Sequence, residues 1–453
     1  MGVGEEWENH RVSATTPSAP QPTPATTSRA VIDLGAIAHN AAVLAQAAGT
    51  PWMAVVKADA YGHGLEPVAR ACLGAGATWL GVAQLAEALH LRSLLDAAGI
   101  ARPAPEARAL PTPTAPRVLT WLVPVLTPER AAAPGSPLRA AIAADLDLSV
   151  STIDQARAIA AAAEAEGCAA RVHLKADTGM SRAGATDNEL PALAAELAGA
   201  ERAGSLAVVG LWSHLSRADE PDSGSTEDHL ARFHAAADAV ASAGLTPVVR
   251  HLAATGGLLW HPDARLDLVR AGIGLYGLSP DPTVATSAGL GLRPAMRLEA
   301  PLTLVKRIPA GQAISYGGTW TAPTDRWVGL VPLGYADGIP RSASGAPVTV
   351  IPSQGGGGDA APAPVHARIV GRVCMDQMVI DLGPAAPGGS GAPAPGARAG
   401  DTAVLWGDGA DPAGIPTADE WAAACGTINY EIVTRLGARV PRIYLGVGWE
   451  DRV

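Results

Sequence analysis

The chain has 453 residues, enough for two domains, one of which would have room for a barrel of about 250 residues. Its net charge of −10 and pI near 5.6 argue against a nucleic-acid-binding protein, because such proteins usually carry basic patches. It contains no uncharged apolar run of about 18 residues, and its first residues are acidic, so we expect neither a membrane span nor secretion.

The cysteines are few, widely scattered and without a C-x-x-C pair. This spacing is typical of reduced thiols and not of a disulfide framework or a zinc site. We therefore expect a cytoplasmic protein with no metal centre. The four cysteines are Cys72, Cys168, Cys374 and Cys425.

The N-terminal half of the chain alternates strand and helix patterns. Residues 1–28 are rich in Ser, Thr, Pro and Ala and predict a disordered tail. A strand at Arg29–Leu34 and a helix at Gly35–Ala48 follow. Further strand–helix units recur every 25–40 residues or so, which predicts parallel βαβ units closed into a (β/α)8 barrel over residues 29–285. The strands expected after the first are Trp52–Val56, Thr78–Val82, Val118–Val125, Leu146–Val150, Arg171–Leu174, Ala207–Leu211, Val248–His251 and Asp267–Arg270.

After Pro280 the pattern changes to short runs with period-two alternation, broken by Gly and Pro. This pattern predicts a second, mostly β domain over residues 286–453. Two low-complexity Gly/Ala/Pro stretches, Gln354–Pro362 and Pro384–Arg398, are interpreted as mobile loops without a function of their own.

Lys57 is the first candidate for chemistry. It closes the buried strand Trp52–Val56, where partial desolvation lowers the pKa of an amine and frees its lone pair for Schiff-base formation with an aldehyde. The chain has only two other lysines, Lys175 and Lys306. Because the active site of a barrel gathers at the C-terminal ends of its strands, the polar residues that end other strands are expected beside Lys57.

The segment WMAVVKADAYGHG, residues 52–64, resembles the cofactor-lysine motif of the alanine racemases, which bind pyridoxal 5′-phosphate (PLP) on a (β/α)8 barrel. The resemblance extends, with interruptions, from about Arg29 to about Arg442. It implies that Lys57 forms an aldimine with PLP and that Tyr61 reaches the cofactor phosphate.

Two further segments extend the resemblance. KADTGMSR, residues 175–182, is similar to the segment whose arginine, here Arg182, contacts the cofactor phenolate and helps to place the substrate carboxylate. Lys175 matches a family lysine that is often carbamylated, which would give an anion able to orient that arginine. His214 and His251 match positions in a chain of hydrogen bonds that runs to the arginine under the pyridine ring.

The remaining cofactor contacts follow from RAGIGLYGLSP, residues 270–280, and neighbouring motifs. By resemblance, Arg270 faces the pyridine nitrogen. Since arginine stays charged and cannot accept a proton, that nitrogen would remain unprotonated and transamination would be suppressed. Ala254 stands where the family commonly has Asn. The residues that the resemblance assigns to the phosphate are Tyr61, Thr255, Gly272, Ile273 and Tyr430.

The β domain supplies the second half of the expected site. AISYGGTW presents Tyr316, and the resemblance places this phenol and Lys57 on opposite faces of the bound amino acid, one removing the α-proton and the other returning it. Met375 and Asp376 match substrate-carboxylate positions. All three would serve the other subunit's site, which implies a homodimer.

The activity implied is that of an alanine racemase interconverting L- and D-alanine for peptidoglycan synthesis. Three alternatives remain open. One is a decarboxylase or a racemase of broader scope on the same architecture. Another is a single-barrel PLP carrier without catalysis. The last is a degenerate regulator, motivated by Ala254.

Overall fold

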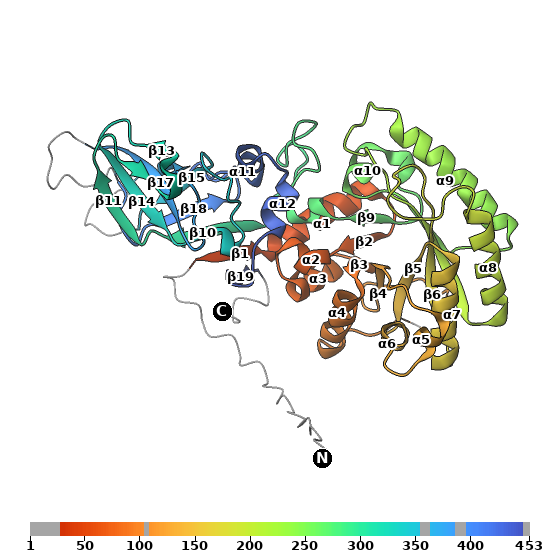
Figure 1. Ribbon diagram of the computed structural model, residues 1–453. Helices are drawn as coiled ribbons and strands as arrows, with labels where there is room; N and C mark the ends of the chain where they lie inside the picture. The colour runs from red at the N-terminus through yellow and green to blue at the C-terminus, as the bar shows by residue number, and fades with distance from the viewer. Residues whose placement is uncertain (1–27, 104–107, 354–362, 386–395, 447–453) are drawn as a thin grey trace, which may run out of the picture.

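The computed structural model describes residues 28–103, 108–353, 363–385 and 396–446 (Figure 1). The disordered tail predicted for residues 1–28 lies outside this part of the chain except for its last residue. The predicted loop at 354–362, and residues 386–395 of the loop predicted at 384–398, also lie outside it.

Eight parallel strands form the barrel-like sheet of the first domain, in the order β8-β7-β6-β5-β4-β3-β2-β9. Backbone hydrogen bonds from Asp267 N to Arg250 O (3.1 Å) and from Arg270 N to Ala253 O (3.0 Å) join the segments at its two ends. The predicted barrel is confirmed. The strands are β2 Trp52–Val55, β3 Trp79–Gln84, β4 Arg117–Leu122, β5 Leu146–Val150, β6 Ala170–Lys175, β7 Leu206–Trp212, β8 Val249–His251 and β9 Val269–Ala271.

The barrel strands are buried along most of their length, as expected for a parallel sheet covered on both faces. A cluster of large apolar side chains, distinct from the main core, fills the barrel near the N-terminal ends of the strands. This packing leaves the opposite, C-terminal end for a polar site. The cluster consists of Met53, Trp79, Leu119, Val249 and Leu268.

Helices cover the outside of the barrel (Figure 1), and their ends follow local capping chemistry. At the start of α7, Thr152 Oγ1 accepts a hydrogen bond from Gln155 N, and the helix stops at Gly167, whose φ of 73° is left-handed. No described helix combines the length and the apolar character needed to cross a bilayer. The helices are α1 Leu34–Ala48, α2 Lys57–Tyr61, α3 Leu65–Gly74, α4 Leu85–Ala97, α5 Pro128–Ala132, α6 Pro137–Ala143, α7 Ile153–Glu166, α8 Leu190–Ala203, α9 Ser225–Ser242 and α10 Thr255–Trp260.

The second domain is mostly β, as predicted. Its nine-stranded sheet has the order β11-β14-β17-β16-β15-β18-β10-β1-β19, and a two-stranded sheet pairs β12 with β13. The new elements are β10 Met296–Pro301, β11 Leu304–Ile308, β12 Ala313–Ile314, β13 Trp320–Thr321, β14 Arg326–Val331, β15 Pro347–Ile351, β16 Val365–Val370, β17 Met378–Pro384, β18 Thr402–Trp406, α11 Ala418–Cys425, α12 Asn429–Thr434 and β19 Arg442–Leu445.

The first strand, β1 (Arg29–Asp33), corrects the predicted start of the barrel segment. It pairs antiparallel with β10 and parallel with β19, so it belongs to the C-terminal sheet. The strand-then-helix pattern at this point resembles a barrel unit, but a local pattern does not reveal which distant strand is the partner. The strands of the barrel itself begin at Trp52.

The C-terminal domain reaches back to the segment that carries Lys57. Arg442 Nε donates to Gly62 O at 3.0 Å, and Asn429 Nδ2 donates to Ser279 O at 2.9 Å. In Figure 1, α12 lies between the β domain and the barrel. The end of the barrel that holds Lys57 is therefore braced by both domains.

Candidate active site

Lys57 follows β2 and begins α2, a short segment whose backbone forms a left-handed turn. The four residues that follow it, Ala58 through Tyr61, have φ between +52° and +56°. For residues other than glycine this conformation costs roughly 1–2 kcal/mol each. Side-chain hydrogen bonds hold the turn, because Asp59 N donates to Glu87 Oε1 (3.0 Å) and Leu65 N donates to Asp59 Oδ1 (2.8 Å). The turn brings Lys57 and Tyr61 to the same cavity.

The cavity has a volume of about 160 Å³ and lies at the C-terminal end of the barrel. Both domains line it, since Tyr430 comes from α12. Six of the residues predicted for the cofactor therefore share one enclosed space. Its lining consists of Lys57, Tyr61, His214, Leu215, Ser216, Ala218, Asp219, Ala254, Thr255, Gly256, Ile273 and Tyr430.

The surroundings of the Lys57 amine favour its neutral form. Burial lowers the pKa of Lys57 most, and the positive charge of Arg182 lowers it further, against the opposing effect of the Glu87 carboxylate. Its Nζ lies 5.8 Å from the centre of the Tyr61 ring and 5.9 Å from that of Trp121. A lowered pKa makes the neutral amine, the nucleophile that carbonyl chemistry requires, easier to form.

Several hydrogen-bond donors gather around the cavity. Gly272 N donates to Thr255 Oγ1 at 3.0 Å. Ile273 begins the 3₁₀ helix Ile273–Tyr276, so its N–H has no acceptor within that helix. Burial raises the pKa of the Tyr61 and Tyr430 phenols, which keeps both protonated as donors. Such a set of N–H and O–H groups fits a phosphate.

The donors that fit a phosphate form a cradle made of Tyr61, Thr255, Gly272, Ile273 and Tyr430. Two glycines leave room for it. A Cβ at Gly272 would lie 2.8 Å from Tyr61 Oη, and a Cβ at Gly256 would overlap the carboxylate of Asp219. Asp219 is the one acidic residue in the lining. Burial raises its pKa, and the nearby Asp281 carboxylate adds to the rise, which favours its protonated form beside an anionic ligand.

Gly272→Ala is expected to weaken PLP binding about tenfold, because the new methyl group would displace the Tyr61 hydroxyl. Titration of the apoprotein with PLP measures the change. Gly199→Ala is the matched control, since a Cβ there meets no atom within 4 Å, on helix α8. That variant should bind PLP normally and gain about 0.5–1 kcal/mol of stability. Unchanged PLP affinity in Gly272→Ala would contradict the assigned cradle.

Arg270 is buried in the short strand β9 and is held by several acceptors. Its Nη2 donates to the carbonyls of Ser213 (2.9 Å) and Leu252 (2.8 Å) and to His214 Nδ1 (2.9 Å), while Nη1 donates to His251 Nδ1 (3.1 Å). The chain of hydrogen bonds expected through both histidines is thus present. Burial lowers the pKa of Arg270 to about 9, which leaves the guanidinium charged at neutral pH.

The segment that carries Lys175 and Arg182 lies beside the same residues. Lys175 Nζ is 4.3 Å from the centre of the Trp212 ring. Burial lowers the pKa of Lys175 to about 8, helped by the charges of Arg270 and Arg182. Asp177 Oδ1 accepts hydrogen bonds from two backbone N–H groups of the following turn, which presents the exposed Arg182.

Three predicted residues of the β domain lie outside the cavity lining. Tyr316 is 70 % exposed and Met375 is 52 % exposed, and Asp376 forms an ion pair with Arg439 (2.8 Å). Figure 1 shows β13, the strand that follows Tyr316, within the β domain and away from the barrel. The structure of one chain therefore does not bring Tyr316 to Lys57.

Some residues near the site were not anticipated from the sequence. The side chains of Asp147 and His173 are fully buried in the barrel, and Trp212 stacks on His251 at 5.5 Å. The sequence did contain a sign of this buried polar face. Polar residues occupy every second position of β6, at Arg171, His173 and Lys175, although the strand was expected to be buried. Such alternation marks one face of a strand.

Comparison with known proteins agrees with this architecture. A family model described as "Alanine racemase, N-terminal domain" matches residues 32–280, and one described as "Alanine racemase, C-terminal domain" matches residues 295–444. A relative from Beutenbergia cavernae named alanine racemase is 51 % identical over 420 residues, covering 92 % of this chain and 98 % of its own. One from Thermobifida fusca, also named alanine racemase, is 46 % identical, with coverages of 92 % and 97 %.

Solved structures give the same result. The alanine racemase of a D-cycloserine-producing Streptomyces lavendulae superposes with a TM-score of 0.80 at 42 % identity, covering 95 % of this chain and 99 % of its own. That of Streptomyces coelicolor gives 0.78 at 44 % identity, with coverages of 93 % and 98 %. Fold and matches together define an amino-acid racemase, an isomerase of two domains, and not a single-barrel carrier. The chain belongs to the alanine racemase family, whose members depend on PLP.

Proposed function

We propose that this enzyme interconverts L- and D-alanine with PLP held in the Lys57 cavity. One observation carries the proposal. The Lys57 amine, whose pKa is lowered, a set of hydrogen-bond donors suited to a phosphate, and the buried Arg270 all lie around one cavity of about 160 Å³. The names of the matched relatives support the same reaction.

When bound, PLP would withdraw electrons from the substrate Cα and so make its proton acidic. Lys57 would hold the cofactor aldehyde and exchange a proton at one face of that carbon. Tyr61, Tyr430, Thr255 and the N–H groups of Gly272 and Ile273 would hold the phosphate. Arg270 would present a charged donor at the ring nitrogen, and because arginine accepts no proton, that nitrogen would stay unprotonated.

The second acid–base group is Tyr316 of the partner subunit in this proposal. Its support is the exposure of Tyr316 on the β domain, together with its absence from the lining of its own chain's cavity. Met375 and Asp376 follow Cys374, which contacts Ser315, the residue before Tyr316, and they would contact the substrate carboxylate of the partner's site. A homodimer with shared active sites follows, and the four free cysteines support a cytoplasmic enzyme. We further propose that its D-alanine enters peptidoglycan.

A chiral assay on L-alanine tests the reaction. Purified enzyme with PLP should convert either enantiomer to a mixture approaching equal amounts, with no loss of total alanine. Release of the amine would identify a decarboxylase, and equal turnover of serine would identify a racemase of broader scope. A visible cofactor band without any D-alanine would identify a non-catalytic regulator.

A further inference from the structure

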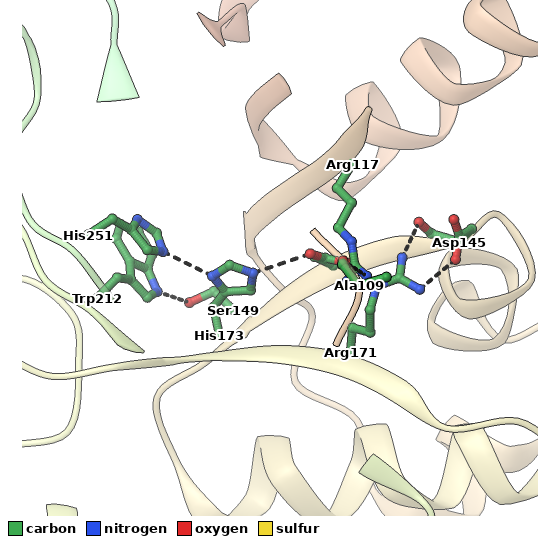
Figure 2. Close-up of polar contacts among 9 residues, drawn as sticks. Ala109, Arg117, Asp145, Ser149, Arg171, His173, Trp212 and His251 are labelled. Carbon is green, nitrogen blue, oxygen red and sulfur yellow. Dashed lines mark hydrogen bonds and ion pairs between the residues drawn. The ribbon is translucent and has the colours of Figure 1, made fainter. Parts of the chain in front are cut away.

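A line of buried hydrogen bonds leads from Arg270 into the interior of the barrel. Beyond the bond between Arg270 and His251, His251 Nε2 lies 2.9 Å from His173 Nδ1, and His173 Nε2 lies 3.2 Å from Asp147 Oδ2. Figure 2 shows the dashed lines that run through the two histidines toward the cluster with Arg171. The two histidines and Asp147 are 0 % exposed, and Arg270 is 4 % exposed.

The far end of this line is an ionised carboxylate. Arg171 Nε donates to Asp147 Oδ1 at 2.5 Å, and Arg117 Nη1 lies 3.7 Å from the same oxygen. Burial acts to raise the pKa of Asp147, but the positive charge of Arg171 and the hydrogen bond from His173 outweigh it and lower the pKa. Asp147 is therefore an acceptor only.

The two ends fix every proton between them. Arginine can only donate, so His251 must accept at Nδ1 and carry its single proton on Nε2. That proton points at His173 Nδ1, which must accept, so His173 carries its own proton on Nε2 and donates it to Asp147. A second proton on either ring would place two hydrogens in one bond. Both histidines are consequently neutral, in one tautomer each.

The packing around the rings prevents them from adapting by rotation. A Cβ at Gly210 would overlap the His173 ring, and Trp79 meets that ring edge-on at 5.2 Å. The Trp212 ring stacks on His251 with an angle of 7° between the planes, and its Nε1 donates to Ser149 at 3.1 Å (Figure 2). If the donor or acceptor at one end of the line changes, the histidines can therefore adjust only by a change of tautomer.

We propose that Asp147 and His173 are positioning residues for the reaction, acting through His251 to hold the guanidinium of Arg270 in its orientation. The proposal rests on the proposed function, because Arg270 matters through the cofactor ring that it is assigned to face. In the described part of the chain, Nε of Arg270 makes no hydrogen bond to protein, so it remains a donor for a ligand while Nη1 and Nη2 are held.

Asp147→Asn is expected to reverse the donor and acceptor roles along this line of hydrogen bonds, while the size and shape of the side chain stay nearly the same. The amide oxygen of the new side chain will face Arg171, which can only donate, and its NH₂ group will face His173 Nε2. His173 must then move its proton to Nδ1, and His251 must move its proton to Nδ1 as well. That proton meets the Arg270 Nη1–H donor, so the bond between Arg270 and His251 breaks.

Asp145→Asn is the matched control. Asp145 Oδ1 accepts from Nη1 of the same arginine, Arg171, at 2.6 Å, but Asp145 is not part of the line. Its φ of 59° is one that asparagine tolerates. Both variants remove one carboxylate from Arg171, so a general loss of stability affects both, and only Asp147→Asn reverses the histidine tautomers.

The first readout needs no cofactor. In apoprotein labelled with ¹⁵N-histidine, the spectrum shows which ring nitrogens carry protons, and the signals of His173 are assigned by their loss in His173→Phe. Wild type and Asp145→Asn should show protonated Nε2 for both rings, whereas Asp147→Asn should show protonated Nδ1. With PLP added, Asp147→Asn should lose about 10–100-fold in PLP affinity and kcat, the range found for outer-shell partners of bound metals, and shift the cofactor absorption band.

Unchanged tautomers, or reversed tautomers with unchanged PLP affinity, absorption and kcat, would overturn the proposal. If Asp147→Asn does not fold, His173→Phe answers the same question, because it cuts the line and leaves Asp147 paired with Arg171. It should lower PLP affinity and kcat in the same direction, and normal values there would also overturn the proposal. A wild type without racemase activity would refute the proposed function, while the tautomer experiment on apoprotein would still report on the line.

Discussion

Lys57→Ala is expected to reduce alanine racemisation by at least about four orders of magnitude, because it removes both the amine that holds the cofactor and one of the two acid–base groups. The structure gives this lysine a lowered pKa through burial and through Arg182, at the edge of a cavity that Tyr61, Thr255 and Ile273 also line. Chiral separation of the products after long incubation with saturating PLP measures the loss.

The scarcity of lysine makes the control unusually clean. Of the three lysines, Lys306 lies exposed on β11 in the other domain, so Lys306→Ala should racemise alanine at the wild-type rate. Reduction of the PLP-loaded wild type with borohydride should label the peptide that contains Lys57. Labelling of the Lys306 peptide instead, or turnover by Lys57→Ala close to that of wild type, would show that the cavity is not the active site.

Tyr316→Phe is expected to lower kcat by about 10²–10⁴-fold while PLP binding stays near normal. The change removes one hydroxyl from a side chain that is already 70 % exposed in the single chain, so folding should be unaffected. Racemisation started separately from L- and D-alanine, with PLP affinity measured in parallel, separates loss of chemistry from loss of cofactor. A rate near that of wild type would remove Tyr316 from the mechanism.

Mixing the two inactive variants shows which chain supplies the phenol. In a dimer of Lys57→Ala with Tyr316→Phe, shared sites leave one site with both groups intact and the other with neither. Random assembly at equal amounts should then restore about one quarter of wild-type activity. If each site used the Tyr316 of its own chain, the mixture would stay inactive.

Much of the fold followed from local sequence patterns. The eight barrel strands were found because apolar runs and helical spacing alternate at barrel intervals, and the β domain was found because its runs have period two. The partner of β1 was not found, since Arg29–Asp33 pairs with strands that lie several hundred residues later. The left-handed turn after Lys57 was also missed, because alanine and aspartate rarely adopt that conformation and only distant contacts such as Glu87 sustain it.

The residues of the candidate site were likewise predictable from the sequence only in part. Lys57, His214 and Arg270 lie at or just beyond the ends of the strands expected from the sequence, so the geometry of a barrel predicts that they meet. Their particular roles came from resemblance to a family and not from spacing. Asp147 could not be found by either route, because it lies toward the start of β5, away from the strand ends, and becomes relevant only through two histidines that the fold stacks in line.

The pairing of β1 has a consequence for how the polypeptide matures. Its sheet neighbours β10 and β19 lie much later in the chain and are translated long after it. Strand β1 therefore stays unpaired while the barrel residues are translated. A nascent enzyme released early would carry an exposed edge strand, so premature termination should yield aggregating fragments and not a free-standing barrel.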